Sequence, residues 1–207
     1  MPTSPFRWYR AAPAAAALCL FTTAAQAGPL TVTVTGSNGK PLASAIVTVV
    51  VKGTRTAAAP GTMVQIAQRE RQFQPQLIVF QTGTAVQFPN FDTVRHHVYS
   101  FSPIQKFELK LYAGTPAAPV VFDKPGIATL GCNIHDRMSA WVVVVDTPYF
   151  AKTDATGAAQ IELPPGEHRL RAWHPGLTEF GTWVEQAVHV GSGAERATIA
   201  VPVESSV

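Results

Sequence analysis

The sequence of 207 residues has little cysteine, little charge and no long apolar run beyond its N-terminal segment. Charged residues make up 14% of the chain and hydrophobic residues 46%, a balance that argues against intrinsic disorder. Because no run of 18 or more apolar residues follows the N-terminal segment, no transmembrane span is predicted in the mature chain. A sustained 3.6-residue apolar period is also lacking, so strands are the expected elements.

Residues 1–27 have the three parts of a secretory signal peptide. Arg7 and Arg10 give it a positive start, residues 11–21 are apolar, and an A-x-A cleavage pattern ends at Ala27. We therefore expect an exported protein that is cleaved after Ala27. Loss of the two arginines leaves 14 basic residues against 13 acidic ones, so the net charge falls from +3 to +1. With neither a basic stripe nor a recognition motif, the mature chain is not expected to bind nucleic acid.

Cysteine occurs only twice in the sequence, and its scarcity limits the chemistry of the mature chain. Cys19 lies in the segment expected to be removed, which leaves Cys132 alone in the mature chain. A single cysteine excludes an intramolecular disulfide. Cys132 is then a buried thiol, a residue that pairs between chains, or a ligand or nucleophile.

Short runs of alternating or β-branched residues indicate strands separated by Gly and Pro turns. The expected strands include residues 30–35, 45–51, 77–80, 85–88, 127–130 and 141–145. Many short strands at this spacing favour an all-β sandwich or barrel.

Cys132 opens a C-x2-H-x2-M pattern with His135 and Met138. Thiolate and thioether are soft ligands and imidazole is intermediate, a set that suits copper. Upstream, His96 and His97 stand at the start of an alternating stretch, and one of them would complete the His2Cys set with an axial Met that is typical of blue-copper electron-transfer sites. Because neighbouring strand residues point to opposite faces, we expect only one of these two histidines to bind.

Other chemistries fit this pattern less well. A nucleophilic Cys132 with His135 as its base would need a third group and an oxyanion site, and no cysteine-hydrolase signature surrounds it. A structural zinc site commonly uses two or more thiolates. A multicopper enzyme needs more histidine ligands, and the remaining histidines form no H-x-H pair. A one-copper protein without catalytic activity is the economical interpretation.

Residues 62–146 resemble a cupredoxin, the type 1 blue-copper family that includes amicyanin and plastocyanin. The resemblance rests on the Lys124-Pro125-Gly126 turn, on the short ligand spacing of the amicyanin type, and on His96-His97-Val98 where the family has H-N-V. It implies a Greek-key β-sandwich with one type 1 copper that exchanges electrons with a redox partner such as a cytochrome or dehydrogenase. The copper ligands that it implies are His96, Cys132, His135 and Met138.

The sequences on either side resemble the two halves of a carboxypeptidase regulatory-like, transthyretin-like β-sandwich. Residues 34–49 contain the NGKPL hairpin, and residues 153–173 contain T-D-x-x-G followed by L-P-x-G. We therefore expect a discontinuous sandwich of residues 28–61 and 147–207 around a cupredoxin domain of residues 62–146. A single elaborated sandwich is the alternative.

The whole chain most resembles exported bacterial cupredoxin-like proteins called methylamine utilization proteins, which implies a periplasmic location. The expected function is a one-electron carrier that is not an enzyme. Two alternatives stay open: a copper-binding or delivery protein of the same compartment, and a metal-free β-sandwich that acts through protein interactions.

Overall fold

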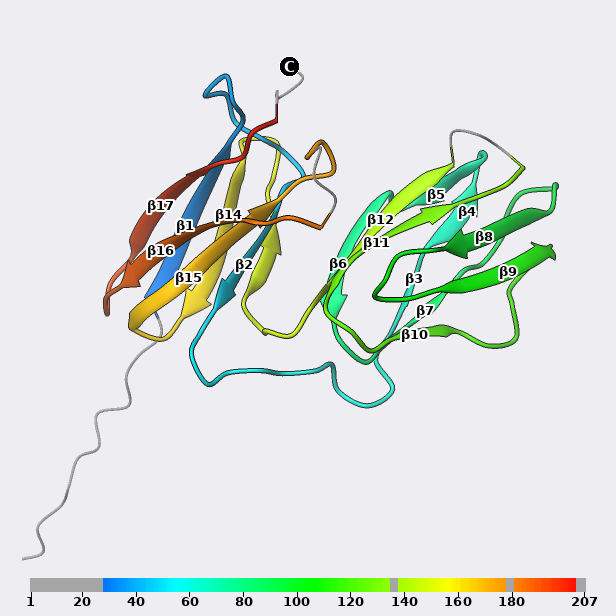
Figure 1. Ribbon diagram of the computed structural model, residues 1–207, viewed down its shortest axis with the longest axis horizontal. Helices are drawn as coiled ribbons and strands as arrows, with labels where there is room; N and C mark the ends of the chain where they lie inside the picture. Colours follow the sequence, from blue (N-terminus) through cyan, green and yellow to red (C-terminus); the bar gives the residue numbers. More distant parts are fainter. Residues whose placement is uncertain (1–27, 135–137, 178–180, 204–207) are drawn as a thin grey trace, which may run out of the picture.

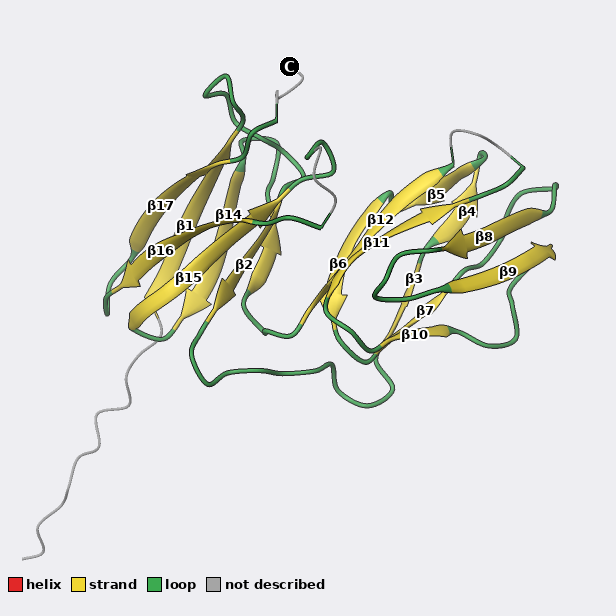
Figure 2. Ribbon diagram, viewed as in Figure 1, coloured by secondary structure: helices red, strands yellow, loops and turns green. Residues whose placement is uncertain are grey.

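The computed structural model describes residues 28–134, 138–177 and 181–203, and these residues form strands joined by loops without any helix (Figures 1 and 2). The all-β prediction is therefore confirmed. No helix in the described residues could cross a membrane. The strands are β1 Gly28–Thr35, β2 Ile46–Val50, β3 Met63–Gln65, β4 Ala67–Arg69, β5 Gln72–Gln74, β6 Leu77–Gln81, β7 Thr84–Gln87, β8 His96–Ser100, β9 Phe107–Tyr112, β10 Val120–Phe122, β11 Gly126–Gly131, β12 Ser139–Val145, β13 Phe150–Lys152, β14 Ala158–Leu163, β15 Gly166–Trp173, β16 Val184–Val190 and β17 Glu195–Ala200.

Strands from both ends of the sequence form two sheets, which we call the outer sandwich (Figure 1). One sheet has the order β14-β1-β17 and the other the order β13-β2-β15-β16. Side chains of both sheets meet in one apolar cluster that includes Leu30, Val49 and Leu170. β1 alternates buried and half-buried residues along its whole length, as its sequence pattern predicts.

The strands between β2 and β13 form a second group, which we call the central sandwich (Figure 1). Its larger sheet has the order β6-β12-β11-β8-β9, facing a sheet of order β10-β7-β3 and the small hairpin β4-β5. Their shared apolar cluster includes Phe73, Phe122, Leu130 and Cys132. β2 and β13 pair antiparallel through Thr48 and Phe150, so the chain leaves and re-enters the outer sandwich on neighbouring strands.

β12 explains how the two sandwiches are joined. Its residues 142–145 are all buried, although one face of a strand at a sandwich surface usually meets water. Val142 and Val144 belong to the central cluster, whereas Val143 and Val145 face a third cluster. This third cluster, the interface cluster, consists of the buried residues Ile46, Leu77, Ile127, Val143, Val145 and Trp173. It takes Ile46 and Trp173 from the outer sandwich, which covers the second face of β12.

Candidate metal centre

The loop from β7 to β8 is held in place by Asn90, a buried side chain. Its Nδ2 group donates to the carbonyls of Val94 (2.9 Å) and Tyr112 (3.0 Å). Its Oδ1 atom accepts the N–H of Asp92 at 2.9 Å, which forms an Asx turn. One side chain thus fixes both the course of the loop and the start of β8.

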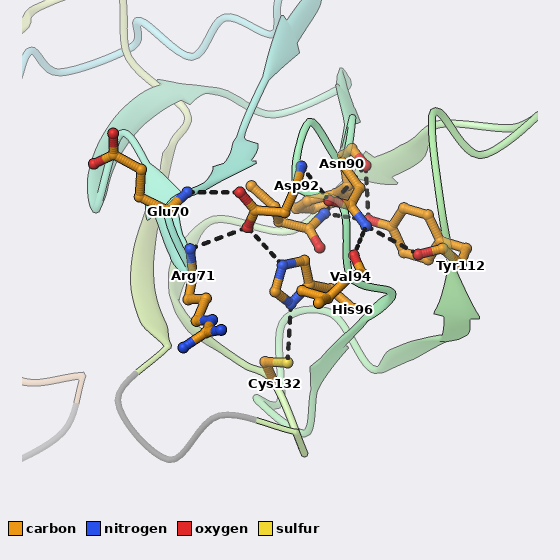
Figure 3. A network of polar contacts seen from close by, with 10 residues as sticks. Glu70, Arg71, Asn90, Asp92, Val94, His96, Tyr112 and Cys132 are labelled. Carbon is orange, nitrogen blue, oxygen red and sulfur yellow. Dashed lines mark hydrogen bonds and ion pairs between the residues drawn. The ribbon is translucent and has the colours of Figure 1, made fainter.

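His96 and Cys132 are brought together by the packing of β8 against β11. His96 is the first residue of β8, and Cys132 directly follows β11, whose Gly131 pairs with Tyr99 of β8. The His96 side chain is fully buried and that of Cys132 nearly so. His96 Nδ1 lies 3.9 Å from Cys132 Sγ (Figure 3). Two of the residues expected as copper ligands, 36 positions apart in the sequence, therefore face each other.

The other ring nitrogen of His96 contacts a carboxylate. His96 Nε2 lies 2.7 Å from Asp92 Oδ2 (Figure 3). Because an ionised carboxylate only accepts hydrogen bonds, this contact places a ring proton on Nε2, while Nδ1 is the ring nitrogen that faces Cys132 Sγ. A neutral imidazole binds a metal through its unprotonated nitrogen, and Nδ1 is the nitrogen of His96 that the contact with Asp92 leaves for this role.

Asp92 is itself held by the turn between β4 and β5. Its Oδ1 accepts the backbone N–H of Glu70 at 2.7 Å, and its Oδ2 accepts that of Arg71 at 3.0 Å. Burial raises the pKa of Asp92, but the hydrogen bonds from the Arg71 backbone, from His96 and from the Glu70 backbone outweigh it and lower this pKa below its ordinary value. Asp92 is therefore ionised at neutral pH.

His97 points the other way, as the alternation of a strand predicts, although the pairing of β8 with β9 shifts register between His96 and Val98. Its Nδ1 accepts a hydrogen bond from Asn133 Nδ2 at 2.8 Å. Its Nε2 lies 3.0 Å from Glu108 Oε1, but the geometry of this contact is not that of a hydrogen bond. His97 thus ties β8 to the residue after Cys132, and among the hydrogen bonds of the described residues it is His96 that reaches the Cys132 sulfur.

Met138 and Cys132 flank the loop between β11 and β12. The last pair of these antiparallel strands is Gly131 with Ser139, so Cys132 and Met138 are the next residues on either side. Both are buried in the central cluster. The remaining expected ligand, His135, lies outside the described residues. In the part of the chain that the structure describes, no three His, Cys, Asp or Glu side chains converge as a metal-binding group.

The half-buried phenol of Tyr112, on β9 beside β8, is held by two hydrogen bonds. Tyr112 Oη donates to the Phe88 carbonyl at 2.7 Å and accepts a short hydrogen bond from Gln68 Nε2. Burial raises the pKa of Tyr112 to about 12, and the nearby Cys132 adds to this shift against the hydrogen bond from Gln68. Tyr112 therefore stays neutral and serves as a fixed polar support on the strand that pairs with β8 at His96.

A shallow groove of about 690 Å³ runs along the outer side of Cys132. The ring of Tyr99 lies against Gly131 here: a Cβ at position 131 would approach Tyr99 Cζ to 2.6 Å, so a larger residue does not fit unless the ring moves. Tyr99 stacks on Phe101 with ring centroids 5.0 Å apart, and Phe101 is 74% exposed. All side chains that line the groove in the described part of the chain are uncharged.

The donor atoms fit a metal ion. Imidazole nitrogen and thiolate sulfur bind a first-row metal at about 2.0–2.3 Å, so two such donors in a trigonal arrangement lie roughly 3.8 Å apart. The 3.9 Å between His96 Nδ1 and Cys132 Sγ agrees with that value. The donor set consists of a cysteine sulfur, an imidazole nitrogen and the thioether of Met138, which is buried in the same cluster as Cys132. Its softness is of the kind that copper prefers.

Sequence reasoning assigned no role to Asp92, Gln68 or Tyr112. Asp92 reaches the backbone of a turn about 20 residues earlier, and Gln68 reaches Tyr112 across 44 positions. Contacts between residues so far apart in the sequence cannot be recognised from a local sequence pattern. The one available signal was Asp92 itself, which lies four residues before His96 in the loop that leads into β8.

No family model matches the chain, and no curated protein matches it. Solved structures do match. A purple cupredoxin from Nitrosopumilus maritimus matches at 23% identity with a TM-score of 0.35, over 39% of this chain and 97% of that one. Amicyanin from Paracoccus versutus matches at 16% identity with a TM-score of 0.35, over 47% and 97%. A copper-containing nitrite reductase from Thermus scotoductus matches at 22% identity with a TM-score of 0.37, over 47% of this chain and 25% of that chain.

Proposed function

We propose that the chain is a periplasmic type 1 copper protein that carries single electrons and is not an enzyme. The observation that carries the proposal is the approach of His96 Nδ1 to Cys132 Sγ inside the central sandwich. Cys132 would bind as thiolate, His96 through Nδ1, and Met138 through its thioether as a weak ligand. His135 is proposed as the second imidazole from the C-x2-H-x2-M pattern alone.

Copper, when bound here, supplies a Cu(II)/Cu(I) couple for one-electron exchange. The protein's part is to keep the donor atoms in place. His96 is fixed by Asp92, and Cys132 and Met138 are fixed by the paired ends of β11 and β12. Ligands held in this way need little movement when the charge of the metal changes.

The proposal extends to the rest of the chain. Residues 62–146 would be the cupredoxin domain, inserted into a carboxypeptidase regulatory-like sandwich of residues 28–61 and 147–207. Support comes from the pairing of β1 with β14 and β17, which joins the two ends of the sequence. Residues 1–27 would direct export to the periplasm, and the chain would be of the methylamine utilization type, with a cytochrome or dehydrogenase as its redox partner.

The chain of contacts from Asp92 to His96 and on to Cys132 also resembles a catalytic triad with cysteine as the nucleophile and histidine as the base. The buried side chain of Met138 favours copper over this candidate. Met138 lies at the same end of the β11–β12 hairpin as Cys132, and a thioether is a copper ligand that has no role in acyl transfer.

Addition of one equivalent of Cu(II) to the mature chain tests the proposal. We expect an intense visible absorption band from thiolate-to-copper charge transfer, and its loss in Cys132→Ser and His96→Gln. His189→Gln is the matched control, because His189 is an exposed histidine of the outer sandwich and should keep the band. Absence of the band in the unaltered protein would refute the copper proposal, and persistence of the band in His96→Gln would refute the ligand assignment.

A further inference from the structure

Asp92 stands between two parts of the central sandwich that are distant in sequence. On one side its carboxylate accepts two backbone N–H groups from the β4–β5 turn, and on the other it accepts the ring N–H of His96 (Figure 3). The turn residues Glu70 and Arg71 both have positive φ, at 54° and 58°. Two consecutive residues of this kind are typical of a two-residue type I′ hairpin turn.

Positive φ is unfavourable for residues other than glycine, and neither Glu70 nor Arg71 is one of the asparagine or aspartate residues that tolerate it best. In this conformation both turn N–H groups are directed at one carboxylate. The hydrogen bonds to Asp92 therefore offset part of the cost of the turn. The Asp92 side chain is only 16% exposed, so water competes weakly for these contacts.

We propose that Asp92 is the positioning residue of this site: held by the β4–β5 turn, it fixes the ring of His96 with Nδ1 towards Cys132 and makes that nitrogen a stronger donor to a metal. This inference rests on the proposed copper function. A carboxylate on the far nitrogen of a ligating histidine sets the tautomer and raises ligand basicity. Greater basicity favours Cu(II) over Cu(I), so Asp92 also lowers the reduction potential.

The β4–β5 turn holds Asp92 through backbone N–H groups, so its effect on Asp92 can be distinguished from that of the Arg71 side-chain charge. The guanidinium of Arg71 makes no contact with Asp92 among the hydrogen bonds and ion pairs of the described residues, whereas its N–H does. Arg71→Gly removes the positive charge, keeps the N–H and relieves the positive φ. The positioning of His96 should therefore survive this substitution.

The first measurement uses metal-free protein. Nitrogen-15 NMR of labelled histidines reports which ring nitrogen of His96 carries the proton. We expect the Nε2–H tautomer in the unaltered protein and in Arg71→Gly, and a mixture of tautomers in Asp92→Ala. A single Nε2–H tautomer in Asp92→Ala would overturn the proposal. This readout does not need copper, so it stays decisive even if the proposed copper function fails.

The second measurement compares copper-loaded Asp92→Asn with the unaltered protein. Loss of such a partner typically weakens metal binding about 10- to 100-fold. If Cu(II) binding weakens by this factor and Cu(I) binding does not, the reduction potential rises by roughly 60–120 mV, at 59 mV per tenfold for one electron. Asp123→Asn is the charge-matched control, because Asp123 is exposed and precedes β11 at the end opposite Cys132.

We expect Asp123→Asn and Arg71→Gly to leave the potential unchanged. An equal shift in Asp92→Asn and Asp123→Asn would mean that only net charge matters, and would overturn the proposal. So would an Arg71→Gly shift as large as that of Asp92→Asn, because the guanidinium would then do the work assigned to the backbone.

Discussion

Among the described residues, the outer sandwich buries three polar side chains, all of them threonines, whereas the central sandwich buries seven of five residue types. Thr153 is representative of the outer group: its hydroxyl donates to Leu42 and accepts from Ala45, which closes a connection between backbone segments. The buried polar residues of the central sandwich are Gln68, Thr84, Asn90, His96, His97, Ser100 and Ser102.

Burial of a polar group costs free energy unless hydrogen bonds replace those to water. Thr147 and Thr153 of the outer sandwich keep this cost low, because a hydroxyl is small and a nearby backbone carbonyl accepts its hydrogen bond. The central sandwich instead buries two imidazoles and two amides, which demand several partners each. A fold that needs only stability has no use for this network, so the excess polarity marks the place where the proposed metal chemistry is supported.

Trp173 tests how far the two sandwiches are independent, and it should have the largest effect. It is almost fully buried in the interface cluster beside Ile46, its partner across β15 and β2. We expect Trp173→Ala to lower the free energy of unfolding by about 3–5 kcal/mol. Contact between the sandwiches should weaken, so denaturant unfolding followed by circular dichroism and by the copper band should separate into two transitions.

Val49→Ala is the control for this experiment, because Val49 lies in the core of the outer sandwich alone. It should lower stability while the two signals still change together. A single shared transition in Trp173→Ala would show that the interface cluster does not couple the sandwiches.

The comparison can be sharpened with two buried polar residues of similar hydrogen-bond content, Asn90 and Thr153. Substitution of either by alanine leaves backbone groups without partners and should cost about 1–3 kcal/mol. Only Asn90→Ala should also weaken Cu(II) binding, by roughly tenfold, because Asn90 fixes the loop that carries Asp92. Chemical denaturation and copper titration of both variants measure the two effects. Equal copper affinity in both would contradict a special role for the central network.

The smallest expected effect concerns His174, at the end of β15 in the outer sandwich. Burial lowers its pKa below the ordinary value, against the opposing effect of a hydrogen bond with the Ala43 backbone. The unfolded chain then binds more protons than the folded one at mildly acidic pH. We therefore expect the free energy of unfolding to have its highest value above about pH 6.5, as far as His174 is concerned. It should fall as the pH drops towards the lowered pKa of His174.

His174→Asn separates this titration from that of other histidines. Nδ1 of His174 accepts the N–H of Gly176 at 3.0 Å, and an asparagine oxygen can take over that role. The difference in urea midpoint between pH 5 and pH 7.5 should be smaller in this variant than in the unaltered protein. Val49→Ala, which changes no titratable group, should lower both midpoints and leave their difference as it is. An unchanged difference in His174→Asn would assign the pH dependence to other groups.

Strands were predictable here both where apolar and polar residues alternate and where β-branched residues run together. β1 alternates along its length, and β2, β6, β7, β11 and β12 all overlap the runs expected from sequence. The run of β12 was visible, but the reason for it was not: only the packing of a second sandwich explains why Val143 and Val145 are as buried as their neighbours.

The candidate site was predictable for the residues that carry distinctive chemistry. Cys132 and Met138 stand out by type and spacing, and the structure places both at one end of the β11–β12 hairpin. The alternation of a strand predicted that His96 and His97 point to opposite faces, and His96 is the one whose side chain faces Cys132. The support provided by Asp92 and the β4–β5 turn was not predictable, because it depends on a loop meeting a hairpin after the sandwich has closed.

The two-faced burial of β12 also limits how the molecule can be divided. Cut out of the chain, residues 62–146 would present Leu77, Ile127, Val143 and Val145 to solvent on one side of their sheet. Exposed apolar patches of this kind promote association. An isolated central fragment would be a poor substitute for the whole protein in the laboratory, and in the full chain the outer sandwich acts as a covalently attached solubilising partner.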